Sequence, residues 1–313
     1  MAMLIGAIRR YVMDSEENMK VCVYGLGHLG SVTAACLASV GHEVYGMQLQ
    51  FGVFGPEPKL NELYKEMLEK GALRVGNKDR IREAEVLWVT FDTPVDDNDR
   101  ADVDYVLGKV REVMPYVAES TPVIVSSQLP VGTIRKLEGE FPRHTFVCIP
   151  ENLRHGTAVD NFLHPDRIVV GVRADTDRRK ILELLSYIFN QGDWITEGAA
   201  FIEFMSIESA EMTKHAINAF LATSICFINE IAAICELVGA DPKEVERGLK
   251  TEARIGPKAY LKPGGPYTGK TLARDVEYLD EVNHGQYCLP LLESLKRSNG
   301  MTTIMERIKH GRA

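Results

Sequence analysis

A glycine-rich turn between a short apolar strand and a helix constrains this chain more than any other feature of its sequence. Gly25, Gly27 and Gly30 form a Gly-x-Gly-x-x-Gly pattern directly after the β-branched run 21–24 and at the start of a helical stretch. Glycines at these spacings permit a tight turn and let the backbone approach a pyrophosphate, whose charge the N–H groups at the helix N-terminus can hold. A second predicted strand follows at 43–47. The pattern therefore predicts a dinucleotide-binding unit rather than a plain turn.

The end of the second predicted strand bears on the choice of nucleotide. An acid commonly binds the adenosine ribose hydroxyls there, but this chain has Gln48 and Gln50. An amide can still hydrogen-bond a hydroxyl, and it does not repel a 2′-phosphate. Because no arginine or lysine occurs between Gln48 and Lys59 to attract that phosphate, we expect NAD, with NADP left open. Gln48 is counted among the cofactor-binding residues, together with His28 and Leu29 inside the glycine loop.

The order of the predicted elements indicates two domains. Between residues 20 and 172 short apolar runs alternate with helical-period stretches, which is typical of β-α-β units on a parallel sheet; strands are expected at 21–24, 43–47, 86–90, 123–126, 145–149 and 168–172. From Ser206 the pattern becomes one helix of roughly 30 residues, capped by Ser206 and closed by Gly239. The predicted fold class is α/β: a doubly wound parallel sheet (Rossmann) followed by a long connecting helix and a small helical domain. We expect an N-terminal extension at 1–18, a dinucleotide-binding domain at 19–205, and a helical substrate and dimerisation domain at 206–313.

Composition restricts the partners of the chain. The 313 residues carry a net charge of −8, without a basic stripe interleaved with aromatic residues, which argues against nucleic acid. The sequence has no uninterrupted run of 18 apolar residues, so no membrane span is predicted. The six cysteines form no Cys-x-x-Cys pair and the histidines lack metal-ligand spacing. We expect a reducing cytoplasm and no metal.

Several motifs in order resemble the UDP-glucose/GDP-mannose dehydrogenase family. They are the segment VYGLGHLGSVTAACLASVGHEVYG, Thr93-Pro94, the Pro-Val-Gly-Thr run 130–133, Pro150-Glu151 with Arg154 and Gly156, the Pro-Asp-Arg run 165–167, the helix AEMTKHAINAFLATSICFINE, and Arg254 with Gly256. The resemblance spans about residues 20–278. It implies an enzyme of nucleotide-sugar metabolism that oxidises a primary alcohol to a carboxylate in two hydride steps with NAD, trapping the intermediate as a cysteine thioester. It also implies that Thr93 and Pro94 line the cofactor site and that Arg154 and Arg254 bind substrate, with Arg254 reaching across a dimer.

Two departures from the family pattern bear on the chemistry. The resemblance places Glu151, Lys214, Asn218 and Asp275 at reacting positions, but Thr271 stands where the glycine-rich loop of the family has its cysteine. A thiol with a pKa near 8.5 supplies thiolate near neutrality, whereas an unactivated hydroxyl supplies no comparable nucleophile. Family members also carry a further nucleotide-sugar-binding domain after the helical one, and this sequence ends at residue 313. Both departures favour a single hydride transfer on a smaller or differently held substrate.

The residues themselves support these roles and leave alternatives. Lys214 and Asn218 share one face of an apolar helix, with Asn229 near the same face. They either hold a substrate oxygen together, or Lys214 extends its ammonium to solvent and Asn218 is a capped asparagine. Glu151 follows the strand 145–149 at the end where open α/β sheets bind ligands, or it is a surface glutamate. Asp275 either is a helix N-cap or accepts the alcohol proton through a water.

The predicted function is a nicotinamide-dependent oxidoreductase that moves one hydride between an alcohol and a carbonyl, working as a cytoplasmic homodimer on a sugar-derived small molecule. Lys214 and Asn218 would hold the carbinol oxygen, Asp275 would manage its proton, Glu151 would orient the site, and Asn229 would help to bind substrate. Three alternatives stay open. They are a 3-hydroxyacid-type dehydrogenase, which the Lys-x-x-x-Asn pair also resembles, a complete nucleotide-sugar 6-dehydrogenase, and a catalytically inactive NAD-binding partner protein.

Overall fold

The computed structural model describes residues 18–49, 57–76, 78–96, 100–151, 153–178, 181–182, 185–186, 201–267 and 271–309. The chain forms two compact units. The first comprises the residues up to Pro94 together with Asp102–Glu211, and the second comprises Val95–Ala101 together with the residues from Met212 onward. Except for Asn18, the expected N-terminal extension lies outside the described residues.

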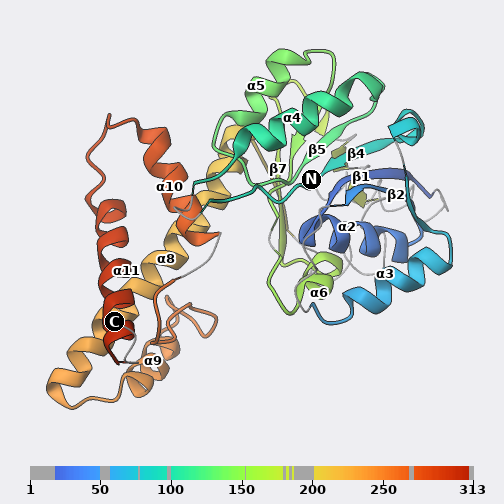
Figure 1. Cartoon of the computed structure of the whole chain (residues 1–313). Coiled ribbons are helices and arrows are strands. Elements are labelled where there is room, and N and C mark those ends of the chain that lie inside the picture. The colour runs from blue at the N-terminus through green and yellow to red at the C-terminus, as the bar shows by residue number, and fades with distance from the viewer. Residues whose placement is uncertain are drawn as a thin grey trace. The chain divides into compact units, whose positions relative to one another are not determined.

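The first unit is built on an eight-stranded sheet of order β3-β2-β1-β4-β5-β6-β7-β8 (Figure 1). The strands are β1 (Lys20–Leu26), β2 (Glu43–Leu49), β3 (Leu73–Val75), β4 (Val86–Val89), β5 (Val123–Val125), β6 (Phe146–Cys148), β7 (Arg167–Gly171) and β8 (Phe201–Met205). All neighbouring strands in the series β3-β2-β1-β4-β5-β6 pair in parallel. This order of six strands is that of the doubly wound dinucleotide-binding fold. All six predicted strands are present, and the predicted fold class is confirmed.

The sheet departs from the prediction at its β7–β8 edge. β6 pairs with β7 antiparallel, and β7 pairs with β8 parallel, so these last two strands run against the other six. The expected fully parallel sheet is therefore wrong at this edge, where mixed sheets commonly carry reversed strands. Two strands were not predicted. β3 has three residues of which only Leu73 is buried, and β8 runs almost directly into the following helix, so neither shows a distinct strand pattern.

Helices cover both faces of the sheet, as its apolar strands require. On one face lie α2 (His28–Ser39), α3 (Leu60–Glu69) and α6 (Ala158–Leu163), and on the other lie α4 (Val103–Val113) and α5 (Thr133–Glu140) (Figure 1). Successive residues of a strand point to opposite faces. Accordingly Val21 and Val23 belong to one core cluster, and Cys22 and Tyr24 to the other.

From Met212 onward the second unit is built on helices. α8 (Ile207–Val238) begins in the first unit and continues into the second, where α9 (Pro242–Thr251), α10 (Leu272–Asn283) and α11 (Pro290–Lys309) follow. The predicted caps are present: the Ser206 hydroxyl accepts from the Ser209 N–H at 3.2 Å, and Gly239 has φ +73° just after the helix. Within the described part of the chain, α8 alone has the length and apolar composition of a membrane span, with a mean hydropathy of 1.7 over 18 residues. Only 22% of that window is buried within the described part of the chain.

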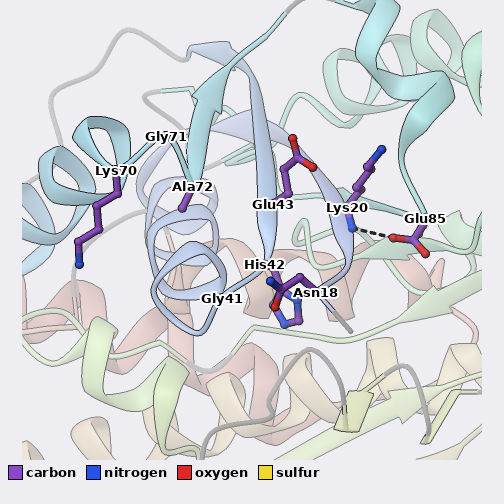
Figure 2. A pocket seen from close by; sticks show the side chains of 9 residues that line it. All are labelled: Asn18, Lys20, Gly41, His42, Glu43, Lys70, Gly71, Ala72 and Glu85. Atoms are coloured by element: carbon purple, nitrogen blue, oxygen red, sulfur yellow. Dashed lines mark hydrogen bonds between the residues drawn. The ribbon is translucent and has the colours of Figure 1, made fainter. Parts of the chain in front are cut away.

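A shallow pocket of the first unit lies at the amino ends of its strands, opposite the glycine loop. It is lined by residues at or just before the starts of β1, β2, β3 and β4, including Lys20, Glu43, Ala72 and Glu85 (Figure 2). The Lys20 N–H donates to the Glu85 carboxylate at 2.8 Å across it. Open α/β sheets bind ligands at the carboxyl ends of their strands, so this pocket is not the cofactor site.

Candidate functional site

The glycine loop joins β1 to α2 and presents bare backbone at the helix N-terminus. Gly25 has φ +108°, and a Cβ built on it would lie 2.8 Å from Phe91. A Cβ on Gly30 would lie 2.0 Å from the carbonyl oxygen of Gly25. Gly27 is the N-cap of α2, so the N-cap residue itself has no side chain to cap the helix. These residues fit a dinucleotide pyrophosphate, because the backbone can approach it closely and the helix N-terminus attracts its charge.

The segment after β4 lies against the same loop. The backbone N–H of His28 donates to the Asp92 carboxylate at 3.0 Å. Thr93 is buried and its hydroxyl donates to the carbonyl of Gln128 at 2.6 Å, while the Pro94 carbonyl accepts from the N-cap residue of α4 at 2.8 Å. Thr93 and Pro94 therefore fix the shape of this segment. Asp92, which the sequence analysis missed, places a carboxylate at the N-terminus of α2.

The other predicted cofactor residues differ in what they can offer. Gln48 is exposed on β2 with φ +56°, a left-handed conformation that is uncommon for a residue other than glycine. Leu29 is buried, so only its backbone can contribute to a cofactor site. The ring of His28 lies 3.3 Å from the Glu57 carboxylate. Gln50 lies outside the described residues.

Polar side chains of α8 and α10 meet in the interior of the second unit. Asp275 is fully buried and accepts a short hydrogen bond from the Asn218 amide and another from the Arg274 guanidinium at 3.2 Å. Nδ1 of His215 lies 3.6 Å from Oδ1 of Asp275, and the His215 ring meets Tyr278 edge-on at 5.3 Å between centroids. Asn218 and Asp275 are 57 residues apart, so the packing of α10 on α8 brings them together. These buried polar groups satisfy one another.

The start of α10 corrects one sequence interpretation. The N-cap of α10 is Thr271, and Asp275 is the fourth residue of the helix, so the N-cap alternative for Asp275 is wrong. The exposed Thr271 side chain makes no capping hydrogen bond. Cys288 is exposed beyond the other end of α10, a helix of 12 residues and therefore about 18 Å long. Cys288 cannot take the place of a cysteine at position 271.

Lys214 is half-buried on α8, one turn before Asn218. One turn earlier in the same helix is Glu211, whose carboxylate accepts from the N–H groups of Gly132 at 2.6 Å and Ile134 at 3.1 Å. Glu211 thereby caps α5 and anchors the motif at 130–133, a role that the sequence analysis did not identify.

The predicted substrate residues of the second unit lie outside the Asn218–Asp275 cluster. The Asn229 amide donates to the Gly265 carbonyl at 3.2 Å and accepts from the Gly264 N–H at 3.0 Å, so it fixes the loop before α10. Arg254 lies just beyond α9 with its side chain 89% exposed, and it pairs with Glu252 at 3.0 Å. That geometry is the one expected of a solvated charge near a helix end.

The two candidates of the first unit shape the turn between β6 and α6. Glu151 is half-buried beyond the carboxyl end of β6, and its carboxylate accepts from the Leu153 N–H at 2.7 Å. The Arg154 guanidinium pairs with Asp166 at 3.0 Å, and its backbone N–H donates to Asn161 at 3.2 Å. Both side chains therefore have structural partners within this unit.

Three contributors to the candidate site were missed in the sequence. Asp92 follows a strand at its carboxyl end, a position that is itself a signal. His215 and Arg274 flank predicted residues in sequence, but their burial against Asp275 becomes visible only when α8 and α10 are packed together.

Comparison with known proteins identifies the family. Residues 19–191 match the NAD binding domain of the UDP-glucose/GDP-mannose dehydrogenase family, and residues 208–301 match its central domain. The chain is 32% identical over 301 residues to a UDP-glucose 6-dehydrogenase of Bacillus subtilis, covering 90% of this chain and 66% of that protein. It is 31% identical over 282 residues to the enzyme of the same name from Pseudomonas aeruginosa, covering 83% of this chain and 60% of that protein. The chain thus spans less than two thirds of the length of these relatives.

Solved structures share the fold of this chain. A UDP-glucose dehydrogenase from Pyrobaculum islandicum superposes with a TM-score of 0.80 at 24% identity, over 92% of this chain and 69% of that one. A GDP-mannose dehydrogenase from Pseudomonas aeruginosa gives 0.67 at 27% identity, over 91% and 69%. A 3-hydroxyisobutyrate dehydrogenase from Mycobacterium tuberculosis gives 0.64 at 18% identity, over 91% and 94%, and shares the fold. The predicted resemblance and the predicted NAD cofactor are confirmed: the chain belongs to the UDP-glucose/GDP-mannose dehydrogenase family, with the family's NAD binding domain at residues 19–191.

Proposed function

We propose that this protein is a NAD-dependent oxidoreductase that transfers one hydride between an alcohol and a carbonyl of a nucleotide sugar or another sugar-derived substrate. The observation that carries the proposal is the combination found in the second unit. The buried Asn218–Asp275 pair is in place with Lys214 one turn away, whereas the motif resemblance puts Thr271 at the position of the family cysteine. The relatives named UDP-glucose 6-dehydrogenase support the substrate class.

The glycine loop would hold the cofactor. Gly25, Gly27 and Gly30 would let the pyrophosphate approach the backbone at the N-terminus of α2, and Gln48 would hydrogen-bond a ribose hydroxyl. When bound, NAD supplies the acceptor or donor of the hydride.

The side chains of α8 would stabilise the reacting oxygen. Lys214 and Asn218 lie on one helix face, so an ammonium and an amide N–H can both donate to the same oxygen. Donors aimed at the negative charge that develops on this oxygen lower the barrier. Asp275 accepts a hydrogen bond from one N–H of the Asn218 amide. This bond orients the amide so that its second N–H can donate to the substrate oxygen. Because Asp275 is fully buried between Asn218 and Arg274, positioning fits it better than accepting the substrate proton directly.

Thr271 limits the reaction to one hydride. A second hydride can leave only from an adduct of the aldehyde, either a thiohemiacetal, which is thereby oxidised to a thioester, or a hydrate, and the Thr271 hydroxyl has no sulfur with which to form the first. Purified protein incubated with NAD and a panel of nucleotide sugars, simple sugar alcohols and 3-hydroxy acids is expected to release one NADH per substrate and an aldehyde or ketone. Two NADH with a carboxylate product would contradict the single transfer. NAD binding without turnover of any substrate would favour an inactive partner protein.

We further propose that α8 mediates a homodimer. Phe220, Phe227 and Ile234 recur every seven residues along α8 and are 71%, 47% and 54% exposed. A seven-residue repeat keeps apolar side chains on one stripe, the pattern of a helix packed against another helix. Glu230 and Glu236 place two carboxylates on the same stretch of α8, which favours a second copy of the chain over a lipid bilayer as the occupant. A cytoplasmic location is part of the proposal, supported by five thiols buried within the fold.

Light scattering coupled to size-exclusion chromatography tests the dimer. Wild type is expected at twice the chain mass, Phe227→Asp at the monomer mass, and Leu68→Asp, an equally drastic change at an exposed apolar residue of α3, at the dimer mass. A monomeric wild type, or co-flotation of the protein with lipid vesicles, would overturn it.

A further inference from the structure

A cluster of two histidines and a glutamate adjoins the glycine loop. His28 opens α2, Glu57 lies before α3, and His155 lies in the turn before α6. Their nearest ligand atoms all lie within 4.8 Å of one another, and the two imidazole rings have centroids 4.9 Å apart. All three residues belong to the first unit.

Glu57 is the fixed centre of the cluster. It is 5% exposed, and its two oxygens accept from the N–H groups of Ala158 at 2.8 Å and Gly156 at 2.9 Å. Burial alone would raise the pKa of Glu57, but these two hydrogen bonds and the contact with His28 lower it overall. The nearby Lys59 ammonium is engaged by Asp160 at 2.9 Å. The buried carboxylate therefore meets imidazole as its side-chain partner.

The distance between the His28 ring and the Glu57 carboxylate suits two ligands of one metal ion better than a direct hydrogen bond. Nε2 of His28 lies 3.3 Å from Oε2 of Glu57, which is long for a charge-assisted hydrogen bond of about 2.7–2.9 Å. Two ligands of a tetrahedral zinc ion, each about 2.0–2.2 Å from the metal, are separated by roughly 3.4 Å. His155 is exposed, so its ring can approach by the further ångström or so that a third ligand needs. The backbone donors on Glu57 would hold that ligand in place, as outer partners of metal ligands do.

We propose that His28, Glu57 and His155 bind a divalent transition-metal ion of the zinc class, and that this ion strengthens cofactor binding. Two imidazoles and one carboxylate are a ligand set that zinc accepts. Because His28 is the first residue of α2, the ion adds positive charge beside the helix N-terminus that fits a pyrophosphate. Linkage then requires zinc and NAD each to tighten the binding of the other by the same factor.

Calorimetric titration of chelator-treated protein with ZnCl2 tests the site. Wild type is expected to bind one zinc per chain, and His155→Ala is expected to bind it at least about tenfold more weakly. His164→Ala removes an exposed histidine of the same unit outside the cluster and is expected to match wild type. His28→Gln provides a second loss-of-ligand variant, and thermal unfolding shows whether each variant is folded. Zinc binding that is absent, or unchanged in His155→Ala, would overturn the site.

A second titration tests the linkage. NAD is expected to bind several-fold more tightly to wild type with zinc than without it, and equally in both conditions to His155→Ala. If zinc binds to wild type and leaves its NAD affinity unchanged, the proposed link to the cofactor is wrong. Replacing zinc with Co2+ gives an independent readout, because a tetrahedral site with histidine ligands develops visible absorption that His155→Ala should lack.

Discussion

Replacing Asp92 with asparagine tests how the glycine loop meets an anion. The Asp92 carboxylate accepts from the His28 N–H at 3.0 Å, at the helix end that fits a pyrophosphate. Two negative charges about 5 Å apart repel by about 0.8 kcal/mol in water and about 3.3 kcal/mol at an effective dielectric constant near 20. Asp92 is exposed, so a repulsion in the lower part of this range applies. We take about 1.4 kcal/mol, which corresponds to a tenfold change in affinity.

Calorimetric titration with NAD measures the effect. Asp92→Asn is expected to bind NAD about tenfold more tightly and with a smaller dependence on salt. The asparagine keeps the shape and an oxygen that can accept from His28, so the free energy of unfolding should change by less than about 1 kcal/mol. Asp104→Asn changes net charge equally at an exposed residue of α4 and should leave the affinity within about twofold. An unchanged or weaker affinity of Asp92→Asn would refute the reasoning and show that the carboxylate helps to hold the cofactor.

The remaining predictions concern the reacting oxygen, the glycine loop and the pH dependence of stability. Lys214→Ala should lower kcat about a hundredfold, roughly 3 kcal/mol, with NAD affinity retained, and wild-type turnover would mark Lys214 as a solvated side chain. Gly30→Ala should lower the free energy of unfolding by about 3 kcal/mol in denaturant titration, because its Cβ would meet the Gly25 carbonyl at 2.0 Å. Gly139→Ala, within α5 and with no atom within 4 Å of the added Cβ, should instead stabilise by about 0.5–1 kcal/mol, and equal effects of the two changes would contradict this steric argument. The lowered pKa of Glu57 stabilises the folded protein above the ordinary value of 4.5, and this stabilisation is lost as pH falls through the lower folded value. The difference in free energy of unfolding between wild type and Glu57→Gln should therefore shrink from pH 6 to pH 3. A difference independent of pH would contradict this reasoning.

Local sequence patterns alone determined most of the secondary structure of this protein. The glycine spacing, six of the eight strands and the caps Ser206 and Gly239 follow from short-range rules: glycine tolerates the turn, apolar runs form buried strands, and capping groups end a helix. The same rules place Lys214 and Asn218 on one helix face, because both belong to a single continuous element.

Only the tertiary structure decided what these elements bring together. The reversed direction of β7 and β8 depends on sheet pairing, which no single strand encodes. Asn218 meets Asp275 because α10 packs on α8, and the Asp92 carboxylate reaches the N–H of His28 because β4 lies beside β1. The histidines at 28 and 155 show no ligand spacing in the sequence, yet parallel strands end at one edge of the sheet and collect the loops that follow them. Contacts between residues far apart in the chain are set by packing and burial, and these exist only once the sheet has formed.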